Sequence, residues 1–534
     1  MEYVLDRRAR RFDGGRLVLG GEPVRLVKLS ETGARILDEL VERRPTDSSG
    51  APAAAPVSAS RDELAARLVS AGILHPLPDE VAGLGDVTAV IPVHGAPSSL
   101  GRLVASLVRA GVGAVVVVDD GSPDGGEVAA RAAEAPRATV LRRRWRGGPS
   151  AARNTAVVTT PFVAYLDADV ELEVDDPGRW LRRCVAHLAD EKVALVAPRV
   201  ATKPPSSSPS PSHSSTAIGS HLWAYEERQS PLDLGEAPGL VGVGRRLSYV
   251  PAAALVARRS VIEAAGGFDE TLRYGEDVDL VRRLGATGAL VRYEPSAVVF
   301  HQPRSDLAGF VRQRMGYGSA AAAIDARHPG SVPPFVASPA GAVGAAGALL
   351  SLAAGGPRSW RGLLVASAAL GAGLQPFGRL QHRLGESGCP RPLARAASIS
   401  LRAQLATTAG LLAALRRAYW PALLPALALR PSRRAAAMLL LGANLAGHGR
   451  HALAAATAPR LRAAPVAERL AAGASQLGLG LLDDTAYGLG VLAGCVREGS
   501  AGALRPRIRA TPTGPPSPPA APGGPSRSPS AAAR

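Results

Sequence analysis

Cysteine, aromatic residues and lysine are scarce in this chain of 534 residues. The three cysteines lie far apart and form neither a disulfide framework nor a metal site, which favours a reducing, cytoplasmic compartment. Aromatic residues make up 4% of the chain, and only 3 of the 62 basic residues are lysine. Alanine and arginine are in excess, and we attribute this excess to a GC-rich coding sequence. The N-terminus has no apolar run after its charges, so we expect no secretory signal peptide.

Acidic residues are scarce only in the C-terminal part of the chain. The formal net charge is +17, which would ordinarily suggest a nucleic-acid partner. Residues 1–85 carry a net charge of −1, residues 86–304 are balanced, and residues 305–534 hold 25 basic against 7 acidic residues. Because the excess is confined to that last stretch, we expect no nucleic-acid partner.

Composition divides the chain into four parts, within the range that its length suggests. Residues 45–60 are a flexible interruption, and residues 203–216 form a Ser/Pro loop that is too polar to be buried. From about residue 505 the chain has no apolar periodicity, so we expect a disordered tail. The predicted parts are a small N-terminal module, an α/β domain, an Arg/Ala-rich helical region and the tail, at residues 1–80, 86–305, 306–500 and 505–534.

The α/β domain begins with short apolar runs that alternate with helical spacing. The predicted strands are residues 87–93, 114–118, 138–141 and 162–166. Continuous β-branched runs indicate strands that are buried on both faces, and therefore a parallel sheet covered by helices. Ligands of such sheets bind beyond the carboxyl ends of the strands. Two acidic clusters fall at those ends.

These clusters are Asp119 with Asp120, and Asp167 with Asp169. Carboxylates that converge on one crevice repel each other unless cations or hydrogen-bond donors lie between them. A divalent ion with oxygen ligands, bridging to a diphosphate, would meet that need. The alternative is that each aspartate caps a helix or begins a turn. Two clusters at strand ends favour the functional interpretation.

Three further features carry chemistry. Arg153 follows two glycines and a proline at a helix start, where free N–H groups bind anions; the alternative is a solvated basic loop. Glu276 and Asp277 open a later helix, whose dipole stabilises them, so a carboxylate there could act as a general base. Arg282 and Arg283 offer ion pairs one turn later. His301 ends an apolar strand and is a ligand only if that strand returns beside the acidic crevice.

Together these motifs resemble the family-2 glycosyltransferases, whose fold is the nucleotide-diphospho-sugar transferase arrangement called GT-A. The matching segments are TAVIPVHG (88–95), VVVVDDGSPD (115–124), GGPSAARNTAV (147–157), YLDADVEL (165–172), GGFDE (266–270) and GEDVDLVRRL (275–284). The resemblance implies inverting, metal-dependent transfer from a nucleotide-activated sugar, with Mg²⁺ or Mn²⁺ as cofactor.

The same resemblance implies roles for individual residues. Asp119 and Asp120 would lie at the uracil and ribose, with Pro92 and Arg153 also at the nucleotide sugar. Asp167 would lie near the ribose, and Asp169 would bind the metal. Asp277 would be the general base with Glu276 beside it, and His301 would complete the metal site. Processive members carry a Gln-x-x-Arg-Trp motif that residues 312–317 lack, which favours one or a few transfers.

The N-terminal module resembles the winged-helix domains of the PqqD type, which hold precursor peptides in ribosomal peptide modification. The resemblance rests on residues 24–37, which read as a strand, a Ser30 cap and an amphipathic helix. A small regulatory or packing domain is the alternative. The whole architecture is similar to the glycosyltransferase family of mycofactocin biosynthesis. That similarity implies a UDP-sugar donor, UDP-glucose above all, and a peptide-derived acceptor.

The C-terminal region is apolar and Arg-rich. Residues 335–357 and 362–378 are uncharged, and only the first is long enough to span a bilayer. Arginines beside an anionic leaflet would hold such helices at the cytoplasmic face of the cell membrane. The alternative is a bundle of alanine-rich helices that is not bound to a membrane.

Three other functions compete with this hypothesis. One is a membrane-associated glycosyltransferase with a lipid or cell-wall acceptor, and another is a binding protein that keeps the fold without turnover. A nucleotidyltransferase would more often carry a glycine-rich loop with a lysine after the first strand, which is absent here.

Overall fold

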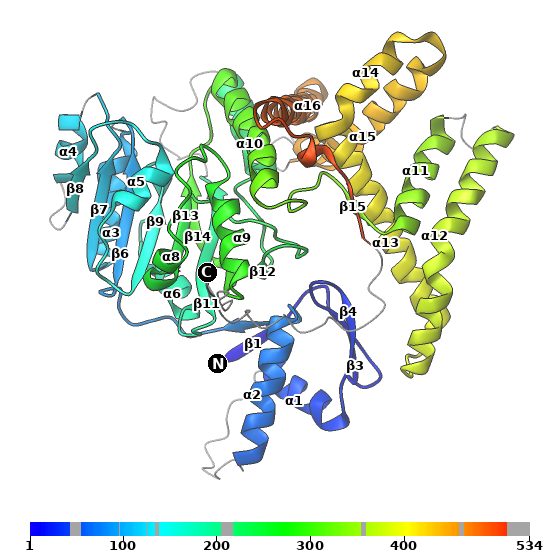
Figure 1. The fold of residues 1–534 in the computed structure, drawn as a ribbon, viewed down its shortest axis with the longest axis horizontal. Coiled ribbons are helices and arrows are strands. Elements are labelled where there is room, and N and C mark those ends of the chain that lie inside the picture. The colour runs from blue at the N-terminus through cyan, green and yellow to red at the C-terminus, as the bar shows by residue number, and fades with distance from the viewer. Residues whose placement is uncertain are drawn as a thin grey trace, which may run out of the picture.

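The computed structural model describes residues 1–42, 55–95, 97–123, 125–133, 138–203, 217–353, 359–458 and 464–509 (Figure 1). The predicted Ser/Pro loop and most of the predicted interruption and tail lie outside these residues. Two corrections fall inside them. Helix α2 (Ala55–Ser70) already begins within the expected interruption. Strand β16 (Arg507–Ile508) pairs with β15 (Val336–Ala337), so the first residues of the expected tail belong to the fold.

The N-terminal module combines two helices with two small sheets. Its remaining elements are β1 (Glu2–Leu5), β2 (Arg10–Phe12), β3 (Leu17–Gly20), β4 (Arg25–Lys28), α1 (Glu31–Val41) and β5 (Leu74–Leu77). Strands β2, β3 and β4 form an antiparallel sheet, and β1 pairs with β5. The predicted strand, cap and helix are confirmed, because Ser30 Oγ accepts the Gly33 N–H at 3.0 Å. The resemblance to the PqqD type stays a prediction.

A nine-stranded sheet forms the centre of the α/β domain. Its strands are β6 (Val87–Val93), β7 (Ala114–Asp119), β8 (Ala138–Arg142), β9 (Phe162–Leu166), β10 (Val170–Glu171), β11 (Val193–Thr202), β12 (Gly239–Val241), β13 (Ala254–Arg258) and β14 (Leu290–His301). The order is β10-β14-β11-β13-β9-β6-β7-β8, with β12 on β14. The four strands predicted from the sequence are confirmed and run parallel, but β13 lies antiparallel to β9, so the whole sheet is mixed.

Helices cover both faces of this sheet. The elements are α3 (Ser99–Arg109), α4 (Gly125–Ala133), α5 (Pro149–Thr155), α6 (Arg179–His187), α7 (Ala217–Gln229), α8 (Arg259–Ala264) and α9 (Glu276–Ala286). Helices α3, α4 and α6 bury one apolar face through Leu103, Val128 and Leu181, whereas α5, α8 and α9 cover the other. All seven residues of β6 are buried, as a strand between two helical layers requires.

The last third of the chain is helical (Figure 1). It consists of α10 (Leu307–Arg327), α11 (Pro339–Ala353), α12 (Trp360–Glu386), α13 (Pro392–Ala414), the π-helix η2 (Leu415–Tyr419), α14 (Trp420–Ala428), α15 (Arg430–Ala456) and α16 (Val466–Arg497). Within the apolar segment at residues 335–357, which is long enough to span a bilayer, the described residues form a helix of 15 residues, α11. In the part of the chain that the structure describes, α16 alone is long and apolar enough to cross a membrane, and half of its most apolar stretch is buried inside the protein.

Candidate active site

A cavity of about 1280 Å³ lies at the carboxyl ends of the central strands. The predicted site residues that line it are Arg153, Asp167, Asp169, Glu276, Asp277 and His301. They come from the last turn of α5, the end of β9, the start of α9 and the end of β14. The structure therefore brings together residues that are up to 148 positions apart in the sequence.

The loops after β6 and β7 are tied together at this edge of the sheet. Pro92 is buried in β6 opposite Val118 of β7. His94 Nδ1 lies 3.1 Å from the carbonyl oxygen of Asp120, and Ser122 Oγ accepts the Gly95 N–H at 2.8 Å. Pro92 thus shapes the strand end behind the loops, and its contact with a nucleotide stays a prediction.

Asp119 and Asp120 have different surroundings. Asp120 accepts the N–H of Gly147 at 2.9 Å and the N–H of Gly148 at 2.7 Å, one with each carboxylate oxygen. Asp119 is fully buried, and its Oδ2 accepts no hydrogen bond among the described residues, although Arg142 Nε lies 3.6 Å away. Asp120 therefore fixes the glycine loop that opens α5, whereas the buried Asp119 Oδ2 has, in the described part of the chain, only the ion pair with Arg142.

Arg153 connects three parts of the site. It donates from Nη2 to Asp167 Oδ1 at 2.7 Å and from Nη1 to Glu276 Oε1 at 3.0 Å. A third contact joins Nη2 to the carbonyl oxygen of Ala252 at 3.3 Å. Burial alone would lower the pKa of Arg153, but the two carboxylates outweigh it and raise the pKa. The guanidinium is thus fully charged and holds both acids in place.

Asp277 is the carboxylate most suited to accept a proton. Its Oδ2 accepts the Ala252 N–H at 3.1 Å, and its Oδ1 accepts the Val278 N–H at 2.7 Å. Burial, and next the charge of Glu276, raise the pKa of Asp277 to about 7. A general base works best when its pKa lies near the working pH. Gly275, at φ 84°, turns the chain into α9, and this left-handed conformation favours glycine.

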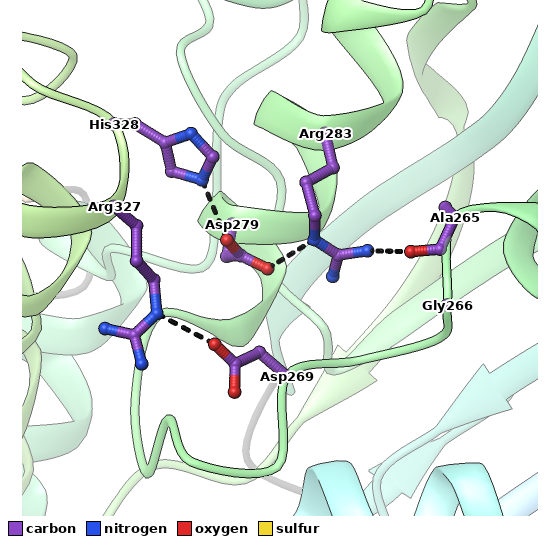
Figure 2. Close-up of a pocket in the computed structure, with 7 residues that line it drawn as sticks. All are labelled: Ala265, Gly266, Asp269, Asp279, Arg283, Arg327 and His328. Atoms are coloured by element: carbon purple, nitrogen blue, oxygen red, sulfur yellow. Dashed lines mark hydrogen bonds and ion pairs between the residues drawn. The ribbon is translucent and has the colours of Figure 1, made fainter. Parts of the chain in front are cut away.

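Asp279, the next acid of α9, faces a different pocket of about 420 Å³ (Figure 2). Its Oδ2 accepts Arg283 Nε at 2.7 Å, and its Oδ1 lies 2.8 Å from His328 Nε2. Asp269 is held in the same pocket by Arg327 Nε at 2.8 Å (Figure 2). These ion pairs clamp α9 to the end of α10. Asp279 is therefore not available as a base toward the large cavity.

Asp169 and His301 meet because β14 returns beside β10, where Val170 pairs with His301. Asp169 Oδ2 lies 3.3 Å from His301 Nε2. Burial raises the pKa of Asp169, but His301 outweighs it and lowers the pKa, and Asp169 in turn raises the pKa of His301. Two ligands about 2.1 Å from one ion lie about 3 Å apart. The pair therefore fits two adjacent positions around a divalent metal.

The described residues contain no group of three metal-ligating side chains. The nearest further acids in the sequence are already paired, Asp167 with Arg153 and Glu171 with Lys203. A metal held by Asp169 and His301 would thus need further ligands besides these acids. A diphosphate and water are the usual source of such ligands.

The C-terminal helices form the opposite wall of the cavity, which the sequence analysis missed. Arg314 of α10 is 2% exposed, donates to Asp483 of α16 at 3.0 Å and pairs with Glu226 of α7. The aromatic side chains of Tyr225 and Tyr317 lie beside this arginine and line the same cavity. Long-range packing of α10 on α16 thus completes the site.

Two arginines of the π-helix contribute to the same wall. Arg416 pairs with Asp484, which also lies 2.8 Å from His448 Nε2. The Arg417 guanidinium lies over the Tyr487 ring at 4.1 Å, and its Nε is 3.4 Å from Asp484. The adjacent acids at 483 and 484, inside an otherwise apolar helix, were the signal that could have revealed this wall. Buried carboxylates require cationic or hydrogen-bonded partners.

The chain is similar to known glycosyltransferases. A model described as "Glycosyl transferase family 2" matches residues 88–245. The pre-mycofactocin glycosyltransferase of Mycobacterium tuberculosis is 36% identical over 522 residues, or 95% of this chain and 97% of that protein. The succinoglycan biosynthesis protein ExoU of Rhizobium meliloti is 32% identical over 212 residues, or 38% of this chain and 58% of that protein. The predicted glycosyltransferase fold class is confirmed.

A solved structure, that of S. aureus TarS, aligns with 44% of this chain and 39% of that chain. Its sequence identity is 16% and its TM-score is 0.28.

We expect Asp277→Asn to stabilise the protein above pH 7. The unfolded chain releases this proton near pH 4, but the folded protein holds it until about pH 7. Stability is therefore lost as the pH rises between these values, because the unfolded state binds fewer protons there. At pH 4 the variant should melt below the wild type, because its amide nitrogen cannot accept the N–H of Ala252 or Val278. At pH 8 calorimetry should give the higher melting temperature for the variant, because the cost of the buried charge outweighs one lost hydrogen bond.

The control is Glu276→Gln, which gives up the ion pair with Arg153 and should melt below the wild type at pH 8. Equal melting temperatures for Asp277→Asn and the wild type at pH 8 would contradict the raised pKa.

Proposed function

Since the chain belongs to the family of the pre-mycofactocin glycosyltransferases, we propose that it transfers glucose from UDP-glucose to mycofactocin, a peptide-derived redox cofactor, or to its precursor. The reaction inverts the anomeric carbon and uses a divalent metal ion. The observation that carries this proposal is the cavity that joins Asp277 to Asp167 and Asp169 at the end of β9; Asp119 and Asp120 are not among the residues that line it. Similarity over nearly the whole length of the pre-mycofactocin glycosyltransferase of Mycobacterium tuberculosis supports mycofactocin or its precursor as the acceptor.

The nucleoside binds at the carboxyl ends of β6 and β7. Asp119 Oδ2 accepts a hydrogen bond from the uracil or ribose, since it has no hydrogen bond of its own among the described residues. Asp120 fixes the glycine loop by accepting the N–H groups of Gly147 and Gly148. Asp167 lies beside the ribose. Arg153 acts as a positioning residue, because its two side-chain partners are the carboxylates of Asp167 and Glu276.

Asp169 and His301 would hold Mg²⁺ or Mn²⁺ against the diphosphate. When bound, the ion neutralises the charge that develops on the leaving UDP. His301 would have to be neutral to hold the ion, so metal binding would compete with the proton that Asp169 favours on the ring.

The chemical step needs one proton acceptor. The acceptor hydroxyl attacks the anomeric carbon from the face opposite UDP, and its oxygen forms the new bond as the bond to UDP breaks. Asp277 takes the hydroxyl proton, and Arg153 holds the neighbouring Glu276 by a hydrogen bond to its Oε1. A carboxylate with a pKa of about 7 is a stronger base than an ordinary aspartate.

The C-terminal helices support a location at the cytoplasmic face of the cell membrane. Leucines that are more than half exposed project from α12, α13 and α15: Leu364, Leu401, Leu405, Leu441 and Leu453. Figure 1 shows α11 and α12 extending away from the sheet. Exposed apolar side chains with arginines nearby favour an anionic leaflet. The same surface favours the second candidate, a transferase with a lipid or cell-wall acceptor.

Asp277→Asn should abolish transfer and leave UDP binding intact. An amide cannot take the proton, and loss of a general base costs about 10²- to 10⁴-fold in rate. Purified protein is incubated with UDP-glucose, other UDP-sugars and a peptide-derived acceptor, and product masses are read. Asp175→Asn, at an exposed position outside the cavity, is the matched control. Wild-type turnover in Asp277→Asn would place the base elsewhere.

Asp169→Ala should weaken UDP binding in Mn²⁺ or Mg²⁺ but change it little in EDTA. The carboxylate acts through the ion, so it contributes nothing once the ion is removed. Calorimetric titration with UDP measures both states, and His301→Gln should behave in the same way. An equal loss with and without metal would show that Asp169 supports the fold and not an ion.

After lysis, the full-length protein should sediment with the membrane fraction. High salt releases it only where arginine–lipid attraction outweighs apolar burial. Replacing Leu401 and Leu405 together by Ser, on one face of α13, should move protein into the supernatant. Wild-type protein found wholly in a low-salt supernatant would contradict a membrane location.

A further inference from the structure

Arg282 is a buried cation in the large cavity that the catalytic proposal does not use. It lies on α9, five residues after Asp277, or about 7.5 Å farther along the helix axis. The residue is 6% exposed and lines the cavity. The sequence predicted an ion pair for it, as for Arg283. Among the described residues Arg283 has one, with Asp279, and Arg282 has none.

The polar atoms around Arg282 lack partners. Its Nη2 reaches the carbonyl oxygen of Ser331 at a long 3.3 Å. Its Nε and Nη1, and the hydroxyl of Ser331, are buried and form no hydrogen bond within the described part of the chain. Burial lowers the pKa of Arg282, and no charged side chain among the described residues offsets this effect. A buried charge without a counter-ion is costly, so an anionic ligand here would gain a strong interaction.

Other cations extend the positive charge along this part of the cavity. Arg507 Nη1 donates to the carbonyl oxygen of Gly330, next to Ser331, at 2.9 Å. Arg509 directly follows strand β16, and its guanidinium lies against Gly244. The neighbouring Arg245 has a buried Nη1 without a hydrogen-bond partner among the described residues. All of these arginines line the same cavity as Asp277.

We propose that Arg282 and Ser331 form a subsite that binds an anionic group, a carboxylate or a phosphate, carried by the acceptor. This inference rests on the proposed function only in taking Asp277 as the acceptor end of the cavity. The donor diphosphate belongs to the other end, at Asp169 and His301. Three unpartnered donor atoms of Arg282 and Ser331 then receive the oxygens of the anion, and Arg507 adds to the attraction.

The test uses inorganic phosphate and acetate as probes on the full-length protein. Phosphate represents a phosphoryl group and acetate a carboxylate. Each is titrated at constant ionic strength against sodium chloride while the melting temperature is followed, and a specific site gives a saturable rise. Wild type is compared with Arg282→Gln and with Arg273→Gln, an exposed arginine of the same cavity.

We expect at least one probe to stabilise the wild type and Arg273→Gln in a saturable way. Arg282→Gln should bind that probe about 10- to 100-fold more weakly, the range for a lost hydrogen bond to a charged group. Arg282→Lys should retain part of the affinity, and Ser331→Ala should lose less than Arg282→Gln. These two variants decide the question if Arg282→Gln does not fold.

Equal saturable responses in wild type and Arg282→Gln would overturn the subsite, as would a response to neither probe. UDP binding is measured on the same samples. UDP binding that persists in Arg282→Gln, together with lost probe binding, separates the subsite from the donor site. Absence of UDP binding in every sample would contradict the proposed function while leaving the anion result to stand.

Discussion

The ion pairs of Arg153 are the constraint on which the site depends. One buried guanidinium joins the last turn of α5 to the end of β9 through Asp167 and to the start of α9 through Glu276. Without it, several carboxylates would converge in a poorly solvated cavity and repel each other. With it, Glu276 is held beside Asp277, where burial first and the charge of Glu276 second raise the pKa of Asp277. The contact therefore sets the positions of the acids, whereas burial contributes most to the basicity of Asp277.

The C-terminal helices form part of the wall of the large cavity. Arg314 connects α10 to α16 and α7 through Asp483 and Glu226. Removal of the chain beyond residue 326 would leave Arg314 and Glu226 without Asp483. Breaking such a buried network costs about 3–5 kcal/mol. The exposed leucines of the proposed membrane surface lie elsewhere on the helical region and do not line the cavity.

Local patterns could predict the strands and their acidic ends, because continuous β-branched runs and the parallel-sheet rule act over short stretches. The sequence could not show that Asp120 serves the glycine loop, that Arg282 and Arg283 face different pockets, or that Arg416 lines the cavity. Each depends on packing between segments far apart in the chain. Arginines that composition assigned to a membrane surface proved to be partners of Asp484.

The pH dependence of kcat/KM for transfer from UDP-glucose tests the central claim most directly, since it reports the ionisation of the base in the free enzyme. With Asp277 as base, kcat/KM rises about tenfold per pH unit below the pKa and levels off near pH 7. The residual activity of Asp277→Asn lacks that inflection. A wild-type profile that is flat between pH 5 and 8, or an inflection that persists in Asp277→Asn, would contradict the account.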